Sequence, residues 1–268
     1  MNKNERLMST ILKRGKNEFG VVGVKAEFEA EGTRIDELLR LLDIARDAGV
    51  TITVKIGGCE AVRDLLEAKQ IGVRYIVAPM VETPYALSKF ISAKNSVFSI
   101  EEQKETSFLF NLETITGFQN LQSLLSLSNK ESGISGIVFG RVDFSGSLGL
   151  GRAGLEDEKV TESILTVARA CLDNSLDLVL GGAISIDSLP IVQRVANIHL
   201  TRFETRKIIF DGAFVNNVEV KKGLLNAIHF ELLWLLNKRD YYNTISAEDS
   251  KRIDMLEARW NLLNTSIL

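Results

Sequence analysis

The chain has 268 residues, of which 45% are apolar and 25% are charged, a balance typical of a folded globular domain. The formal net charge of -3, from 32 basic and 35 acidic residues, leaves no basic excess for binding nucleic acid. The apolar runs are too short to span a membrane, and two cysteines in a chain of this size suit a reducing compartment. We therefore expect a soluble, cytoplasmic protein with a single domain over residues 1–268.

Short apolar runs typical of buried strands alternate with longer segments of helical period from about residue 20 to residue 238. The predicted strands are 21–27, 51–56, 75–79, 108–113, 136–139, 177–180 and 198–203. Residues 96–101 form either a further strand or a surface segment. The helical stripes between the strands include one from Ile35 to Ala45 that stops at Gly49. This alternation predicts an α/β protein with a parallel sheet and helical crossovers.

Seven or eight βα units within this length match a (β/α)8 TIM barrel, which typically has about 250 residues. A doubly wound open sheet gives the same periodicity, so the pattern alone leaves both architectures open. We predict the barrel, with an extra C-terminal helix.

The C-terminal part predicts two further helices, over 221–238 and 247–264, separated by a turn at 240–243. Ser246 is a suitable N-cap for the second helix. Ile253, Leu256 and Trp260 fall on one face of it. Such a face must pack on the barrel or on a neighbouring subunit, and we expect a homo-oligomer.

Charged residues follow nearly every predicted strand. In parallel α/β proteins the functional side chains gather at these carboxyl ends. Glu113 and Asp143 follow successive strands, so both can face one pocket. Two carboxylates without a nearby His or Cys suit Mg²⁺ or Mn²⁺, which a 2-oxo acid can chelate while the metal stabilises its enolate. The alternative is that they only pair with Arg141 and Lys55 or bind loop backbone.

Two other features near the predicted site are less specific. A charged cluster at 202–207, which contains Arg206, is either an anion site or a solvated strand end. Gly149, Gly151 and Gly154 predict a mobile loop over the site, from which Arg152 can reach the substrate.

Several motifs occur in an order that resembles a known family. They are NLET at 111–114 and GRVDFSGSLG at 140–149, with TVKI at 53–56, IVAPMVET at 76–83 and the EFE segment at 27–29. Together they resemble the aldolase/citrate lyase family of the HpcH/HpaI type. The resemblance implies a TIM barrel, lyase or aldol chemistry on pyruvate- or acyl-type enolates, and oligomers that exchange a C-terminal helix.

The resemblance also implies roles for individual residues. Glu113 and Asp143 correspond to the family's metal ligands. The backbone amides of the turn at 140–143 correspond to those that hold the substrate carboxylate. Gly140, Arg141 and Ser145, together with Arg206 from the charged cluster, are therefore the expected substrate-binding positions.

The chain departs from the family pattern at two points. Lys55 stands where the family has a substrate-binding arginine, which keeps the charge but loses the planar guanidinium grip. The family's catalytic histidine has no counterpart, so Glu27 or Glu29 is the expected base. A Schiff base on Lys55 is conceivable, but the metal motif makes it redundant.

These observations predict a metal-dependent carbon–carbon lyase or aldolase that acts through a pyruvate-type enolate of an oxo-acid or acyl substrate. The expected partners are this small molecule and further copies of the chain, with neither nucleic acid nor membrane. The alternatives are an enzyme of the same fold acting on phosphoenolpyruvate or a CoA thioester, and a non-catalytic barrel that serves in binding or assembly.

Overall fold

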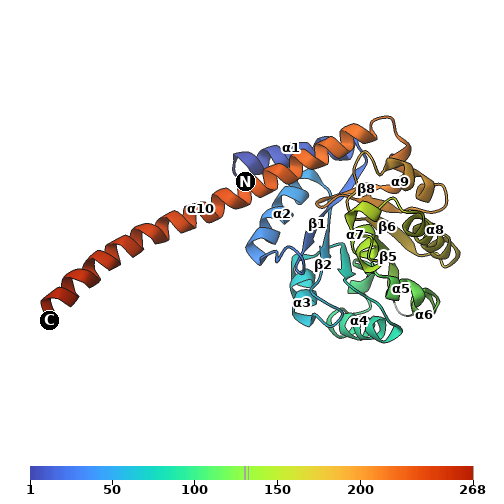
Figure 1. The fold of residues 1–268 in the computed structure, drawn as a ribbon, viewed down its shortest axis with the longest axis horizontal. Coiled ribbons are helices and arrows are strands. Elements are labelled where there is room, and N and C mark those ends of the chain that lie inside the picture. Colours follow the sequence, from blue (N-terminus) through green and yellow to red (C-terminus); the bar gives the residue numbers. More distant parts are fainter. Residues whose placement is uncertain (130, 132, 268) are drawn as a thin grey trace.

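The structure is a computed structural model that describes residues 1–129, 131 and 133–267. Its strands close into one barrel in chain order, which confirms the predicted fold class (Figure 1). The strands are β1 (Val21–Glu27), β2 (Thr51–Lys55), β3 (Tyr75–Ala78), β4 (Ser107–Leu112), β5 (Ile134–Gly140), β6 (Asp177–Gly181), β7 (Arg202–Glu204) and β8 (Ile208–Asp211). The seven predicted strands correspond to β1 to β7, although the last one, predicted at 198–203, overlaps β7 only at residues 202 and 203.

The eighth strand differs from that of a standard barrel. β1 to β7 pair in parallel, whereas β8 runs antiparallel to both β7 and β1. Only residues 205–207 separate β7 from β8. Three residues suffice for a hairpin but not for a crossover helix, so the reversed direction is the only one available. The sequence analysis missed β8 because it expected a helix between strands.

Helices cover the outside of the barrel between its strands (Figure 1). They are α2 (Ile35–Ala48), α3 (Val62–Ile71), α4 (Pro84–Val97), α5 (Ile115–Gln119), α6 (Leu121–Leu127), α7 (Arg141–Ser147), α8 (Glu158–Asp173) and α9 (Leu189–Ala196), with short 3-10 turns η1 (Glu102–Lys104), η2 (Arg152–Gly154) and η3 (Gly212–Asn216). α2 ends at Gly49, as predicted, in the left-handed conformation that a glycine adopts without strain. Residues 96–101 belong to the end of α4 and the turn before η1, not to a strand.

The chain begins and ends in helices that lie side by side. α1 (Lys3–Glu18) starts at an Asn2–Glu5 capping box and buries Met8 and Leu12. It packs against α10 (Val220–Ile267), a single helix of 48 residues. The two helices predicted at 221–238 and 247–264 are therefore one. Residues 224–267 contain no Gly or Pro, so the expected turn at 240–243 has nothing to break the helix.

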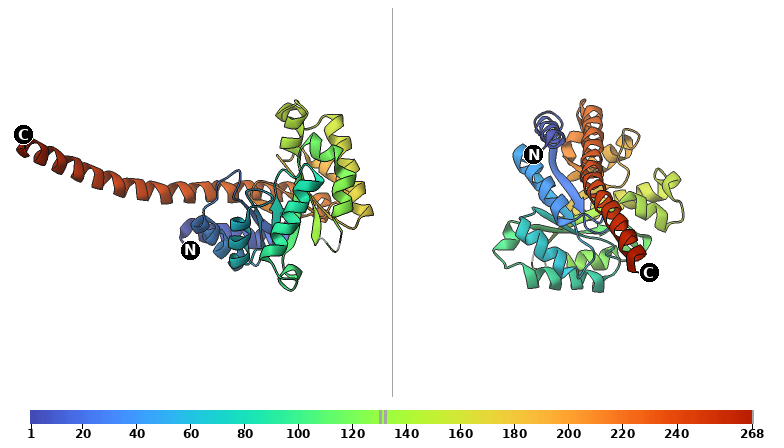
Figure 2. Two further views of the ribbon diagram at one scale, coloured as in Figure 1. Left: turned by 90° about the horizontal axis from the view of Figure 1, so that it is seen from below. Right: turned by 90° about the vertical axis from the view of Figure 1, so that its left-hand side faces the viewer.

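The first part of α10 lies on the barrel, and the second part projects far beyond it (Figures 1 and 2). Large apolar side chains are exposed along the projecting part. They are Ile245, Ile253, Met255, Leu256, Trp260 and Leu262. In the described part of the chain, no helix is both long and apolar enough to cross a membrane.

The inside of the barrel is layered. An apolar layer of Val77, Leu109, Val138 and Val179 fills its middle. At the amino ends of the strands, Arg202 lies over the Tyr75 ring and pairs with Asp177 at 2.7 Å. These two layers fill the interior of the barrel below the carboxyl ends of its strands.

Candidate active site

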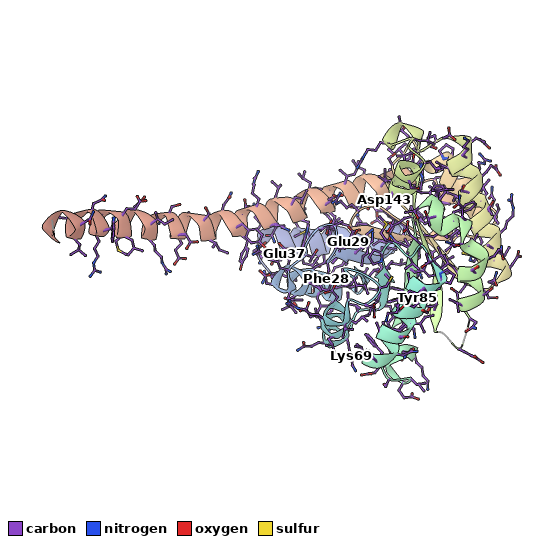
Figure 3. All side chains as sticks on the ribbon, turned by 60° about the horizontal axis from the view of Figure 1, so that its bottom comes forward. Phe28, Glu29, Glu37, Lys69, Tyr85 and Asp143 are labelled. Atoms are coloured by element: carbon purple, nitrogen blue, oxygen red, sulfur yellow. The ribbon has the colours of Figure 1, made fainter. Side chains whose placement is uncertain are left out.

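A cavity of about 770 Å³ opens at the carboxyl ends of the strands. Figure 3 shows Glu29 and Asp143 on this side of the barrel, beside the first part of α10. Four cationic and seven acidic side chains line the cavity, an excess of three negative charges. They are Lys25, Lys55, Arg152 and Arg206, and Glu27, Glu29, Glu113, Asp143, Asp187, Glu204 and Glu231. Charge of this density at one open mouth is typical of a functional site.

Glu113 follows β4 and is almost fully buried. Its Oε1 accepts the Met80 backbone N–H at 3.0 Å, and its Oε2 accepts the Asn111 side-chain amide at 2.6 Å. The Lys55 Nζ lies 3.5 Å from the same Oε2. A Cβ at Gly140 would lie only 2.8 Å from Oε2, so glycine at the end of β5 makes room for this carboxylate.

Asp143 lies in the first turn of α7, which begins directly after β5. Its side chain is exposed, lines the cavity and has no hydrogen-bond or ion-pair partner among the described residues. Asn111 lines the same cavity, and its Oδ1 is buried without a partner in the part of the chain that the structure describes. The site thus has acceptor oxygens that are without a partner among the described residues and can bind a hydrogen-bond donor or a cation.

Lys55 lies between two carboxylates at the end of β2. Its Nζ is 3.2 Å from Glu29 Oε2, in addition to its contact with Glu113. Burial by itself would lower the pKa of Lys55, but the charges of Glu113 and Glu29 outweigh it and raise that pKa. Lys55 therefore stays protonated at neutral pH, which suits anion binding and not Schiff-base formation.

A second lysine bridges two further carboxylates. The Lys25 Nζ is 3.0 Å from Glu27 Oε1 and 2.5 Å from Glu204 Oε1. Burial would raise the pKa of Glu27, but the Lys25 charge and its hydrogen bond outweigh it and lower that pKa. Glu27 is thus held as a carboxylate with little basicity. Glu29 is more exposed and, in the part of the chain that the structure describes, has a single ion pair, with Lys55.

The structure places some of the other predicted substrate-binding residues in the cavity lining and others outside it. Gly140 lines the cavity, whereas Arg141 and Ser145 are fully buried outside its lining. Arg206 lines the cavity but is 3.1 Å from Glu31 Oε1. The Ser145 hydroxyl donates to the Gly151 carbonyl at 2.6 Å, so it supports the following loop.

Sequence reasoning missed three participants. Lys25 lies two residues before Glu27 on β1, and this spacing places both on the inner face of a strand. Asn111 belongs to the NLET motif but was not assigned a role. The Met80 backbone donor depends on a positive φ of 50°, which is rare for this residue type and has no sequence signal.

The donor set fits a hard divalent cation. Glu113, Asp143 and the unpartnered Asn111 Oδ1 are all oxygen donors, as Mg²⁺ and Mn²⁺ prefer. The negative excess of the cavity favours a cation as well. No group of three or more His, Cys, Asp or Glu side chains gathers around one point in the described residues. A cation here would therefore take its remaining ligands from water and substrate.

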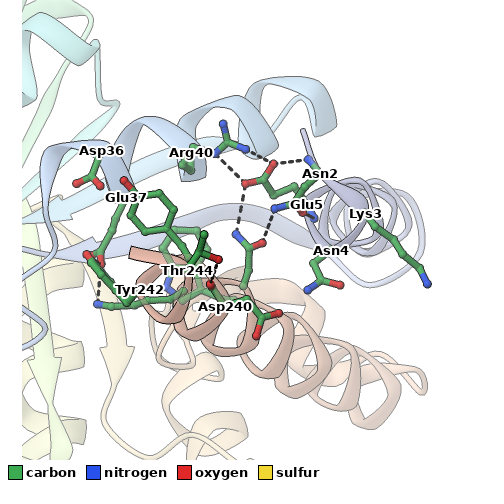
Figure 4. Close-up of a pocket in the computed structure, with 14 residues that line it drawn as sticks. Asn2, Lys3, Asn4, Glu5, Asp36, Glu37, Arg40, Asp240, Tyr242 and Thr244 are labelled. Atoms are coloured by element: carbon green, nitrogen blue, oxygen red, sulfur yellow. Dashed lines mark hydrogen bonds and ion pairs between the residues drawn. The ribbon is translucent and has the colours of Figure 1, made fainter. Parts of the chain in front are cut away.

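A second cavity, of about 760 Å³, lies away from this site between α1, α2 and α10 (Figure 4). Glu5 accepts hydrogen bonds from Arg40 and Asn237 there, and the Tyr242 hydroxyl donates to Glu37 at 2.7 Å. These contacts join α10 to the N-terminal helices. The groove thus anchors α10, and ion pairs join Glu5 to Arg40 and Glu37 to Lys238 there.

Comparisons with known proteins agree with this geometry. The sequence model of the HpcH/HpaI aldolase/citrate lyase family matches residues 23–209. An HpcH/HpaI aldolase from Desulfitobacterium hafniense DCB-2 is 17% identical with a TM-score of 0.58, over 74% of this chain and 82% of that one. A family protein from Burkholderia cenocepacia J2315 is 11% identical with a TM-score of 0.61, over 90% of each chain.

A citrate synthase, SbnG, is also similar in structure, at 16% identity and a TM-score of 0.59, over 75% of this chain and 81% of that one. At such identities these structures share the fold with this chain. No curated protein matches the sequence.

Proposed function

Since the chain belongs to the HpcH/HpaI aldolase/citrate lyase family, a family of lyase and aldolase type, we propose that it is a metal-dependent carbon–carbon lyase or aldolase. Its substrate is an oxo acid or acyl compound that reacts through a pyruvate-type enolate. The observation that carries this proposal is the placement of Glu113 and Asp143 after adjacent strands at one negatively charged cavity, with Lys55 beside Glu113.

Glu113 and Asp143 would hold Mg²⁺ or Mn²⁺, with Asn111 supporting Glu113. When bound, such a cation acts as a Lewis acid that stabilises negative charge on an enolate oxygen. The protein's part is to present the two carboxylates at one cavity. Asp143 is exposed and has no partner among the described residues, whereas Glu113 shares its charge with Lys55.

Lys55 binds and orients the oxo-acid oxygens as a fixed positive charge. Its raised pKa keeps it charged throughout the neutral range. The amide groups at the start of α7, beside Gly140, can take the substrate carboxylate because the first N–H groups of a helix have no partner within it. Lysine here forms fewer directed bonds than an arginine, so we expect looser binding of the enolate part.

Proton transfer falls to Glu29 in this proposal. Glu27 is tied to Lys25 and has a lowered pKa, which makes it a poor base. Glu29 lines the same cavity, is a third exposed, and among the described residues forms its ion pair with Lys55 alone. The Lys55 ion pair also orients the Glu29 carboxylate towards the place where Lys55 would hold the substrate.

One observation favours a second candidate, a barrel that binds without catalysis. The Lys55–Glu113 pair neutralises the central carboxylate internally, as a site without metal would require. The two candidates differ in affinity for the metal. A catalytic site binds Mn²⁺ more tightly when an enolate mimic completes the coordination, whereas a non-catalytic site binds it weakly in every condition.

Isothermal titration with Mn²⁺ and Mg²⁺, with and without oxalate, tests the proposal. We expect saturable binding at one site, strengthened by oxalate and lost in Glu113→Gln. Glu105→Gln, on an exposed turn far from the cavity, is the matched control. Absence of metal binding to the wild type under both conditions would refute the proposal and leave the non-catalytic barrel.

A further inference from the structure

The part of α10 that lies on the barrel has apolar side chains on two opposite faces. On the face against the barrel, the buried side chains are Leu224, Ala227, Phe230 and Trp234. On the other face, four side chains spaced by three, four and three residues are each more than half exposed, and they are Leu225, Ile228, Leu232 and Leu235. Apolar side chains at this spacing form a continuous stripe along a helix. We call this set the inner stripe, and it is open to solvent in the described chain.

The projecting part of α10 repeats this pattern. Its outer stripe has the same spacing and is also more than half exposed, and it consists of Ile253, Leu256, Trp260 and Leu263. The outer stripe begins 28 residues after the start of the inner stripe, which is four repeats of seven. Both stripes therefore belong to one seven-residue repeat. Such a repeat along a long helix is typical of a coiled coil.

The two stripes of one chain cannot cover each other. α10 is a single helix from Val220 to Ile267, and residues 224–267 contain no Gly or Pro at which it could fold back. A cover for the inner stripe must therefore come from outside the chain. The outer stripe of a second copy has the chemistry to supply it, because the two stripes are alike in length, spacing and apolar character.

An antiparallel pair of α10 helices matches the stripes throughout. With residue 244 at the centre, each position of the inner stripe lies opposite one position of the outer stripe. The layers are Leu225 with Leu263, Ile228 with Trp260, Leu232 with Leu256 and Leu235 with Ile253. A shift of one repeat in one direction would set Leu256 against Arg239. A shift in the other direction would set Leu232 against Asp249, so the register is specified.

The charged side chains between and beside the stripes favour the antiparallel direction. At the centre, Arg239 of each copy lies opposite Asp249 of the other. Beside the stripes, Glu231 lies opposite Arg259. In a parallel pair, each Arg239 would instead meet Arg239 of the second copy, and each Asp249 would meet Asp249. Opposite charges in one arrangement and like charges in the other set the orientation of paired helices.

One flanking pair has like charge in the antiparallel arrangement. Lys238 and Arg252 face each other, but each already has a carboxylate of its own chain. The Lys238 Nζ is 2.9 Å from Glu37 Oε1, and the Arg252 Nη2 is 3.0 Å from Glu248 Oε1. These carboxylates reduce the repulsion between the two cations.

We propose that the inner and outer stripes form a docking surface for a second copy of the chain, in which the two α10 helices pair antiparallel over residues 225–263. This overlap is about 57 Å long. Each barrel keeps the first part of its own α10, which α1 and α2 hold in place. The arrangement thus differs from the exchange of a C-terminal helix between barrels that the family resemblance implies.

Disulfide cross-linking tests the direction and the register. Leu235→Cys and Ile253→Cys are oxidised separately and, after mixing under reducing conditions, together, and linked dimers are measured on a non-reducing gel. Facing positions of two paired helices lie within the range that a disulfide spans. We expect linked dimers in the mixture and none above the wild-type level in either variant alone. The wild type, which has Cys59 and Cys171, gives that level.

Met255→Cys is the matched control, because Met255 is exposed on the same projecting part but lies outside the outer stripe. Its mixture with Leu235→Cys should give no linked dimers. Linked dimers in each stripe variant alone would indicate a parallel pair and overturn the proposal. So would absence of linking between Leu235→Cys and Ile253→Cys, equal linking to Met255→Cys, or a wild type that is a monomer in light scattering.

Charge reversal at the centre tests the orientation without added cysteines. Arg239→Asp and Asp249→Arg each place like charges opposite one another in the antiparallel pair, and we expect the dimer Kd in ultracentrifugation to rise at least about tenfold in each. The variant with both changes restores opposite charges, and its Kd should return to within about threefold of the wild type. Both positions are exposed, so the fold should be retained. A Kd that does not rise in the single variants, or is not restored in the double variant, would overturn the antiparallel pairing.

Discussion

The pKa values of buried lysines are shifted in opposite directions at the two ends of the barrel. At the carboxyl ends of the strands, carboxylates flank Lys25 and Lys55 and raise the pKa of each against the effect of burial. Near the amino ends, Lys94 is buried on α4 between the side-chain oxygens of Asn95 and Gln103, each 2.7 Å from its Nζ. Burial lowers the pKa of Lys94 to about 8.

This difference supports the proposal that the active site lies at the carboxyl ends of the strands. Charges at the carboxyl end exceed what mutual pairing requires and surround an open cavity. At the amino end, Asp177 pairs with Arg202 and amide oxygens accept hydrogen bonds from Lys94. The cavity of about 810 Å³ at that end has two charged side chains among its described lining residues, Lys16 and Asp211. Excess charge is costly for stability and is retained where a ligand uses it, whereas matched charge serves the fold.

The largest expected effect on turnover comes from a pair of Asp→Asn variants, with one aspartate replaced at each end of the barrel. Asp143→Asn removes a proposed metal ligand, and we expect turnover to fall by more than about 100-fold. Since Asp143 is exposed and without a described partner, the free energy of unfolding should hardly change. Asp177→Asn breaks the ion pair with Arg202 and should cost about 1 kcal/mol of stability with turnover unchanged.

Steady-state kinetics and urea unfolding of both variants check this reciprocal pattern. Turnover by Asp143→Asn at the wild-type rate would contradict the assignment of the carboxyl end. So would a loss of activity in a folded Asp177→Asn.

A matched pair of lysine variants comes next. In Lys25→Met, Glu27 and Glu204 stay buried without their shared cation, and we expect a loss of about 3–5 kcal/mol in the free energy of unfolding. In Lys94→Met no carboxylate among the described residues loses a partner, and methionine fills similar space. Its stability at pH 7 should stay within about 1 kcal/mol of the wild type. Urea unfolding of both variants measures the two losses of unfolding free energy. Equal losses in the two variants would contradict the difference between the two ends.

The pH dependence of the unfolding free energy should reveal the lowered pKa of Lys94. Its folded-state pKa of about 8 lies below the ordinary value of 10.5. Between these pH values the unfolded chain binds more protons than the folded protein, so the contribution of Lys94 to stability increases with pH, by about 3 kcal/mol at most. The rise should be present in the wild type and absent in Lys94→Met. Parallel pH profiles of unfolding free energy in the two proteins would contradict the lowered pKa.

Sequence reasoning reached the elements and residues whose signal is local. Strand ends, helix stops such as Gly49, and the carboxylates Glu113 and Asp143 all follow from spacing and residue type. The remaining features of the fold and the site depend on contacts between residues that the sequence pattern does not report. Nothing near Ser145 reveals that its hydroxyl donates to the Gly151 carbonyl. The contact between Lys55 and Glu113, 58 residues apart, was one of the pairings that the charges allowed, and only the fold selects it. The reversed β8 depends on the length of one loop, which periodicity does not report.

The projecting part of α10 belongs to neither end of the barrel, and its removal should affect the monomer least. Contacts with α1 and α2 end near Tyr242, whereas Leu256 and Trp260 are 56% and 66% exposed. Such a run of exposed apolar side chains is typical of an interface, and we expect a homo-oligomer that buries it. A chain ending at residue 243 should unfold within about 2 °C of the wild type yet show the mass of a monomer in light scattering.

The full-length double variant Leu256→Lys with Trp260→Lys serves as the control, because it changes the face and keeps the helix. It too should be monomeric. A wild-type chain that is already a monomer, or a shortened chain that keeps the wild-type mass, would show that this face has another use. A stable shortened monomer that still binds metal would show in addition that the carboxyl-end site is complete within one chain.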